Sequence, residues 1–117
     1  MGLENPNTID LAGLERDRSA IVLTIADGLS WADEHGHLVA LQRKLDAYLA
    51  FIASGEVFRV YPEAAGLRVV IDVITGEPMA PAGTELLQLA AIVARGMGAS
   101  VTHRVIPVAG VGRDGLN

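Results

Sequence analysis

The chain has 117 residues, of which 50% are hydrophobic and 20% charged, and it contains no cysteine. This size and composition suffice for one folded domain, and the absence of cysteine excludes disulfide scaffolds, thiolate metal sites and cysteine nucleophiles. The formal net charge is -5 and no basic run exceeds Arg43-Lys44, so nucleic acid is not an expected partner.

The first residues have neither the basic region nor the apolar region of a signal peptide. Pro6 stands where a myristoylation motif needs Ser or Thr. No apolar run is long enough to span a membrane. We therefore expect a cytoplasmic protein without membrane contact, in which residues 1–108 form a single α/β domain and residues 109–117 a flexible glycine-rich tail.

Two strands and a long helix are predicted for the first half. Residues 9–15 and 20–27 indicate a β-hairpin, because Ile21, Leu23 and Ile25 recur with the period of two that a half-buried strand requires. Residues 31–54 predict an amphipathic helix with apolar residues at steps of three and four, Lys44 on its polar side, and Gly55 at its end. Ser30, three residues before Asp33, is the expected N-cap.

The second half predicts a strand, a helix and a strand. Residues 56–66 form a connector that packs down, and residues 67–74 are apolar on both faces except Arg68 and Asp72, which favours a central position in the sheet. Pro81 suits the first turn of a helix over 81–97 whose apolar residues cover most of its circumference, so we expect burial on more than one side. Residues 100–108 form the last strand.

The resulting order, ββαβαβ, predicts an α/β (α+β) two-layer sandwich, in which a four-stranded mixed sheet carries two helices on one face. The other face of the sheet is then uncovered. The order of the strands within the sheet stays open.

Ser30 is the candidate nucleophile. It lies between a strand and a helix, as in the nucleophile elbow of hydrolases, and Asp72 and His103 follow in triad order. The elbow motif has Gly where Ala32 stands, however, and the chain is too short for the hydrolase fold. We therefore interpret Ser30 as a helix cap and His103 as a hydrogen-bonded core or edge residue.

Asp33 and His37 are weak candidates for metal ligands, because residues four apart share a helix face. Two ligands do not make a site, and no second cluster supplies the others. The glycines of residues 110–115 have the letters of a dinucleotide fingerprint, but no helix can follow them. No metal and no cofactor is therefore expected.

Three segments carry a resemblance to a known family. These are Glu4-Asn5-Pro6-Asn7-Thr8-Ile9-Asp10, the segment Val22-Leu23-Thr24-Ile25 through Trp31, and Leu41-Gln42-x-Lys44-Leu45-x-x-Tyr48-Leu49-x-Phe51-Ile52-x-Ser54-Gly55. Up to about residue 97 the chain resembles a small bacterial domain family of unknown function. The resemblance implies a stand-alone protein of this length, and it implies that Asp can replace Ser30, which suits a cap and not a nucleophile.

Two functions of different classes follow. The favoured one is a non-enzymatic module that self-associates or binds another protein, and the alternative is a small hydrolase or metal-dependent binding protein using the Asp33/His37 region. We expect a homodimer joined through the open face of the sheet, although the helix over 81–97 could serve instead. Strand alternation places the interface candidates on that face: Val22, Thr24, Val70, Ile74, Thr102 and Ile106.

Overall fold

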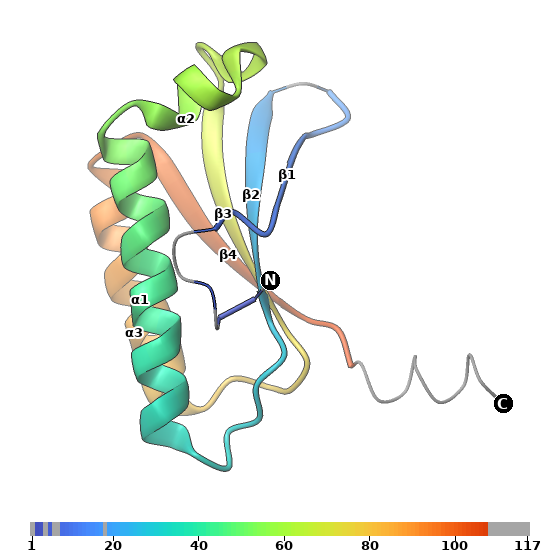
Figure 1. Cartoon of the computed structure of the whole chain (residues 1–117), viewed down its shortest axis with the longest axis vertical. Coiled ribbons are helices and arrows are strands. Elements are labelled where there is room, and N and C mark those ends of the chain that lie inside the picture. Colours follow the sequence, from blue (N-terminus) through green and yellow to red (C-terminus); the bar gives the residue numbers. More distant parts are fainter. Residues whose placement is uncertain (1, 4, 6–7, 18, 108–117) are drawn as a thin grey trace, which may run out of the picture.

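The computed structural model describes residues 2–3, 5, 8–17 and 19–107. The chain forms a sheet and helices in the predicted order, with two short helical turns added where a connector was expected (Figure 1). Residue 108, the expected tail and the glycines of 110–115 lie outside the described residues. The elements are β1 (Leu11–Leu14), β2 (Ala20–Asp27), α1 (Glu34–Ala53), α2 (Glu56–Val60), the 3-10 turn η1 (Pro62–Ala64), β3 (Arg68–Thr75), α3 (Pro81–Arg95) and β4 (Ala99–Val105).

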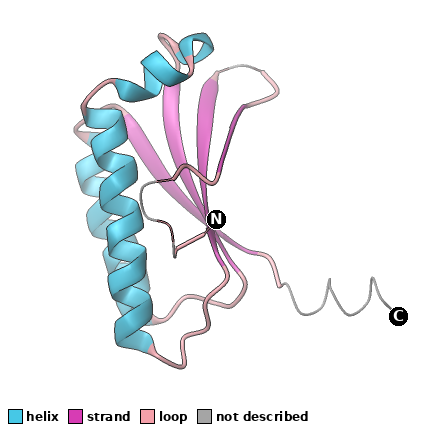
Figure 2. Ribbon diagram, in the orientation of Figure 1, coloured by secondary structure: helices cyan, strands magenta, loops and turns pink. Residues whose placement is uncertain are grey.

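The sheet has four strands in the spatial order β1-β2-β3-β4. β1 pairs antiparallel with β2, whereas β2, β3 and β4 run parallel. The predicted mixed sheet is thus confirmed, and β3 occupies a central position, as its two apolar faces indicated. α1 and α3 lie side by side on one face of the sheet, which makes a two-layer α+β fold (Figure 2).

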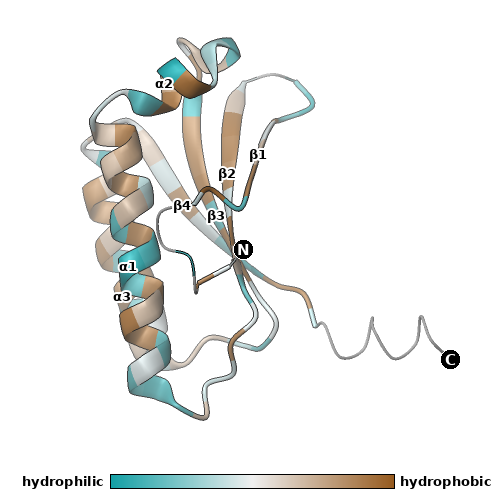
Figure 3. Cartoon of the chain, viewed as in Figure 1, coloured by the Kyte–Doolittle hydropathy of each residue, from teal (hydrophilic) through white to brown (hydrophobic). Residues whose placement is uncertain are grey.

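The core lies between the sheet and the helices. Ile21, Leu23 and Ile25 of β2 are fully buried, as are Ile71 and Val73 beside them on β3. The alternation predicted for these strands is correct, since the residues between them point to the open face. From α1 the core receives the residues spaced by three and four, and Figure 3 colours most of β2 and β3 as hydrophobic. No helix among the described residues is long and apolar enough to cross a membrane.

The predicted start of the long helix is wrong. α1 begins at Glu34, and its N-cap is Asp33, whose Oδ1 accepts a hydrogen bond from the Gly36 amide at 3.1 Å. Glycine at position 36 leaves room for this cap, because a Cβ there would lie 2.3 Å from an Asp33 carboxylate oxygen and would displace that side chain. Gly55, with φ of 80°, ends α1 as expected.

α3 also differs from the prediction, because it is buried on one side only. Gly83, Leu87, Ala90 and Ala94 pack inward. The opposite side of the helix carries large apolar residues in an exposed position, and no described residue covers them. The reason is the layering: α3 lies beside α1 in a single helical layer, so only its sheet-facing side meets the core.

Candidate functional site

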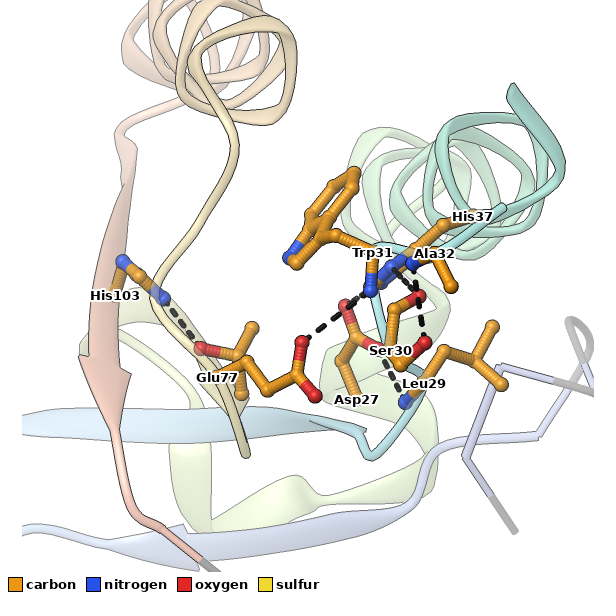
Figure 4. A network of polar contacts seen from close by, with 9 residues as sticks. Asp27, Leu29, Ser30, Trp31, Ala32, His37, Glu77 and His103 are labelled. Atoms are coloured by element: carbon orange, nitrogen blue, oxygen red, sulfur yellow. Dashed lines mark hydrogen bonds and ion pairs between the residues drawn. The ribbon is translucent and has the colours of Figure 1, made fainter. Parts of the chain in front are cut away.

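The carboxyl ends of the parallel strands bring together a group of polar side chains. Asp27 ends β2 and pairs in register with Thr75, which ends β3. The loop after β2 and the first turns of α1 lie above them (Figure 4). Ligand sites of open α/β sheets are found at this edge, so these side chains are the candidates for a catalytic or binding site.

The imidazole of His37 binds the carboxylate of Asp27 and not that of Asp33. Its Nε2 lies 2.5 Å from Asp27 Oδ2, and its Nδ1 lies 3.0 Å from the carbonyl oxygen of Ser30. Both side chains are excluded from solvent. Trp31 stacks on the imidazole, with the ring centroids 3.7 Å apart. The Asp27–His37 pair therefore joins the end of β2 to the first turn of α1, and the indole of Trp31 covers the imidazole.

The hydrogen-bond partners of His37 determine whether its ring nitrogens are free for catalysis. A carbonyl oxygen only accepts, so His37 Nδ1 must be the donor to Ser30. The other ring nitrogen, Nε2, is engaged by Asp27 Oδ2. Both ring nitrogens are consequently occupied by the protein itself. A general base needs a nitrogen within hydrogen-bond reach of the group it deprotonates, and His37 offers none.

The residues that follow the triad order lie apart. Ser30 Oγ accepts from the Ala32 amide at 3.1 Å, so Ser30 closes a local turn and is not the cap of α1 that the sequence predicted. Asp72 faces the open side of the sheet, where it binds Arg104 and Thr102. His103 lies on the helix side and hydrogen-bonds Thr75 Oγ1 at 2.8 Å. His103 is thus the hydrogen-bonded edge residue that was predicted.

The weak metal candidates do not converge either. Asp33 is engaged as the N-cap of α1, and the ring of His37 turns inward to Asp27. Among the residues that the structure describes, no three His, Cys, Asp or Glu side chains gather as metal ligands.

Trp31 lies at the carboxyl ends of the parallel strands, between the starts of α1 and α3. Its backbone amide donates to Glu77 Oε1 at 3.3 Å, and its indole rests on the first turn of α3, where a Cβ on Gly83 would lie 2.8 Å from the ring. The indole Nε1 is buried without a hydrogen-bond partner in the described structure. Trp31 therefore joins the starts of both helices by packing.

A second polar cluster lies between α1 and the segment before β1, and sequence reasoning missed it. Lys44 Nζ lies 2.9 Å from Asp10 Oδ1, and both side chains are fully excluded from solvent. The ammonium group also donates to the carbonyl oxygens of Asn5 and Thr8. Asp10 in turn accepts from the amides of Gly2 and Ala26. Lys44 was expected on the polar side of the helix, and that prediction is wrong.

Tyr48 extends the same cluster to the sheet. Its hydroxyl donates to the carbonyl oxygen of Thr24 at 2.5 Å and accepts from the Asp10 amide at 2.9 Å. Burial raises the pKa of the phenol well above its usual value near 10. Spacing could have revealed this cluster, because Leu41, Lys44, Leu45 and Tyr48 follow the steps of three and four that mark the inner side of α1.

Comparison with known families assigns the chain to one family. A family model described as a family of unknown function, DUF6572, matches residues 1–107. The chain belongs to this family. No curated protein and no solved structure matches it. The predicted resemblance to a family of unknown function is thus confirmed, and the buried cluster contains three of the residues that carried it, namely Asp10, Lys44 and Tyr48.

In this DUF6572 chain the open face of the sheet is more polar than the sequence suggested. Val22, Thr24, Val70, Ile74 and Thr102 occupy the strand positions that alternate with the core residues, and Ile106 follows β4. Thr24 and Val70 are each only 8% exposed. Between them, Asp72 accepts from Thr102 Oγ1 at 2.8 Å and from Arg104 Nη2 at 2.7 Å. The face is therefore a shallow hollow with valines at its floor and charges around it.

The outer side of α3 is the contrasting surface. Leu89, Ile92 and Val93 are 62%, 58% and 50% exposed, and they lie within one turn of each other on the same side of the helix. We call these three residues the α3 stripe. Single exposed apolar residues are ordinary on protein surfaces, but a contiguous group marks a contact surface.

Proposed function

We propose that this chain is a non-enzymatic protein-interaction module whose contact surface is the outer side of α3. The observation that carries the proposal is the α3 stripe: three large aliphatic side chains, each at least half exposed, on one side of a well-formed helix. A helix that is apolar around most of its circumference is ordinarily buried on more than one side. In the described structure the second side has no cover, and a partner protein would supply it.

The state of the polar residues supports the same function over an enzymatic one. The imidazole of His37 has both nitrogens engaged, and the Ser30 hydroxyl contacts the amide of Ala32. Asp33 is engaged in capping α1. The small hydrolase or metal-binding protein considered for this region would need at least one of these groups to face a substrate or an ion.

The open face of the sheet is the second candidate surface. Leu11, on the edge strand β1, is 63% exposed and pairs with Thr24. Parallel sheets are ordinarily covered on both faces, and β2, β3 and β4 leave one face open. The central Asp72–Arg104 pair makes this surface less apolar than the α3 stripe, so we rank it second.

Site-specific photocrosslinking in cells of the source organism tests the function. A photoreactive residue replaces Gln88, which lies on the exposed side of α3, and in a matched variant it replaces Gln42, an exposed glutamine on the outer side of α1. We expect a crosslinked product of defined mass from position 88 that disappears when Ile92→Lys is added. Equal or no crosslinking at the two positions would contradict a contact surface on α3.

A further inference from the structure

We infer that the partner of the α3 stripe is a second copy of this chain, packed with its own α3 in the antiparallel direction about a two-fold axis. This inference rests on the proposed function, because it names the occupant of the same surface. It goes beyond that function by fixing both the partner and the direction of packing.

The α3 stripe is complementary to the α3 stripe of a second copy of the chain. In a two-fold dimer each patch meets an identical patch, so an aliphatic stripe always finds an aliphatic partner. Leu89, Ile92 and Val93 have no polar atom in their side chains that the contact would leave without a hydrogen bond. Two helices pack about 8–10 Å apart through such residues, and both stripes would be hidden at once.

The charges on α3 indicate the direction. Glu85 lies one turn before Leu89, and Arg95 lies one turn after Ile92. Residues 85 and 95 are ten positions apart, which at 3.6 residues per turn places them about 80° from each other around the helix, so both side chains emerge on the outer side of α3 that carries the stripe. Within the described structure neither residue forms an ion pair with another side chain, and both are exposed.

An antiparallel two-fold arrangement makes these charges complementary. The midpoint between Glu85 and Arg95 falls at residue 90, beside the centre of the stripe. A two-fold axis there places Glu85 of each copy beside Arg95 of the other, which gives two ion pairs. Parallel packing would instead place Glu85 of both copies at one end of the contact and Arg95 of both copies at the other, so it would form neither ion pair. The chain's negative net charge opposes association equally in both directions. Only the antiparallel direction gains the two ion pairs, so it is the favoured one.

The contact is small, so the dimer is a weak one. α3 has 15 residues, which corresponds to about 22 Å of helix at about 1.5 Å per residue. A single helix pair of this length falls at the low end of interface sizes, where complexes are transient. We therefore expect a dissociation constant on the order of 10 µM.

Sedimentation equilibrium over chain concentrations from about 1 to 300 µM, a range that brackets this constant, measures the association. The natural chain should shift from monomer to dimer, and Ile92→Lys should stay monomeric, with the melting temperature of the natural chain when both are measured at about 1 µM, where the natural chain is also monomeric. Ala50→Lys, an equivalent change on the outer side of α1, should dimerise normally. Leu11→Lys, on the open face of the sheet, should do so as well. A dimer lost in Leu11→Lys and kept in Ile92→Lys would overturn the inference and place the contact on the sheet.

Charge reversal tests the direction of packing. Glu85→Arg and Arg95→Glu should each raise the dissociation constant about tenfold, because each places two like charges together, and the double variant should restore it. Two single variants without effect, or a double variant as weak as the singles, would exclude the antiparallel arrangement. A monomer at every concentration would exclude the self-association, and the crosslink at position 88 would then show separately whether the interaction function stands.

Discussion

Buried ionisable side chains hold α1 to the sheet near its start and past its middle. Near one end, His37 joins the carboxyl end of β2 through Asp27. Further along, Lys44 and Tyr48 fasten the segment before β1 through Asp10. Burying a charge is costly unless it is paired and hydrogen-bonded, and each of these groups has its partners. In the described structure these side chains position α1 against β2 and against the segment before β1.

Removing one member of the buried pair should be strongly destabilising. Lys44→Met leaves the Asp10 carboxylate buried without its counter-charge, and we expect a loss of about 3–5 kcal/mol in the free energy of unfolding. Arg43→Met, at the neighbouring exposed position, should change it by no more than about 0.5 kcal/mol. Urea unfolding measures both. Equal effects of the two substitutions would show that Lys44 is not buried.

Tyr48 should make the fold sensitive to alkaline pH. Burial raises the pKa of its phenol, so the folded chain keeps the proton above pH ~10, where the unfolded chain releases it. The stability contributed by the phenol is thus fully present below pH ~10 and is lost as the pH rises beyond that value. Tyr48→Phe should be less stable at neutral pH, by about 1–3 kcal/mol, and lose less stability between neutral and alkaline pH. Parallel pH profiles for the two chains would contradict this assignment.

At the scale of elements, the strands and helices follow from the hydrophobic pattern, and their ends depend on contacts that the pattern does not contain. The period of two in Ile21, Leu23 and Ile25 predicted β2 with the bounds that it has. The start of α1 was misplaced because Ser30 and Asp33 are both good caps, and the sequence does not show that Gly36 makes room for the carboxylate of Asp33. Lys44 was misplaced because a charged residue was assigned to the solvent side although its spacing put it inside.

The two caps can be separated by mutation. Asp33→Ala removes the acceptor for the Gly36 amide and should cost about 1 kcal/mol of stability. Ser30→Ala should cost clearly less, because Ser30 caps only a local turn outside the helix. Thermal or urea unfolding of both variants measures the difference. A larger loss for Ser30→Ala would restore the cap that the sequence predicted.

At the scale of the whole molecule, the described residues form a single layer of helices on a single sheet, and they leave the open face of the sheet and the outer side of α3 uncovered. The sequence predicted one of them, the open face of the sheet, from strand alternation. It could not show that Asp72 would bind Arg104 and Thr102 in the middle of that face. Nor could it show that the outer side of α3 would remain exposed, because an apolar helix alone does not reveal how many layers surround it. Both surfaces follow from tertiary packing.

The central claim is that the α3 stripe is covered by a second copy of the chain. The most direct measurement is the melting temperature as a function of protein concentration, because a dimer that unfolds to monomers becomes more stable as the concentration rises. At concentrations above the dissociation constant, we expect the melting temperature of the natural chain to rise by about 2–4 °C for each tenfold increase in concentration. The melting temperature of Ile92→Lys should not change with concentration. A melting temperature of the natural chain that stays constant from micromolar to millimolar concentration would contradict the claim.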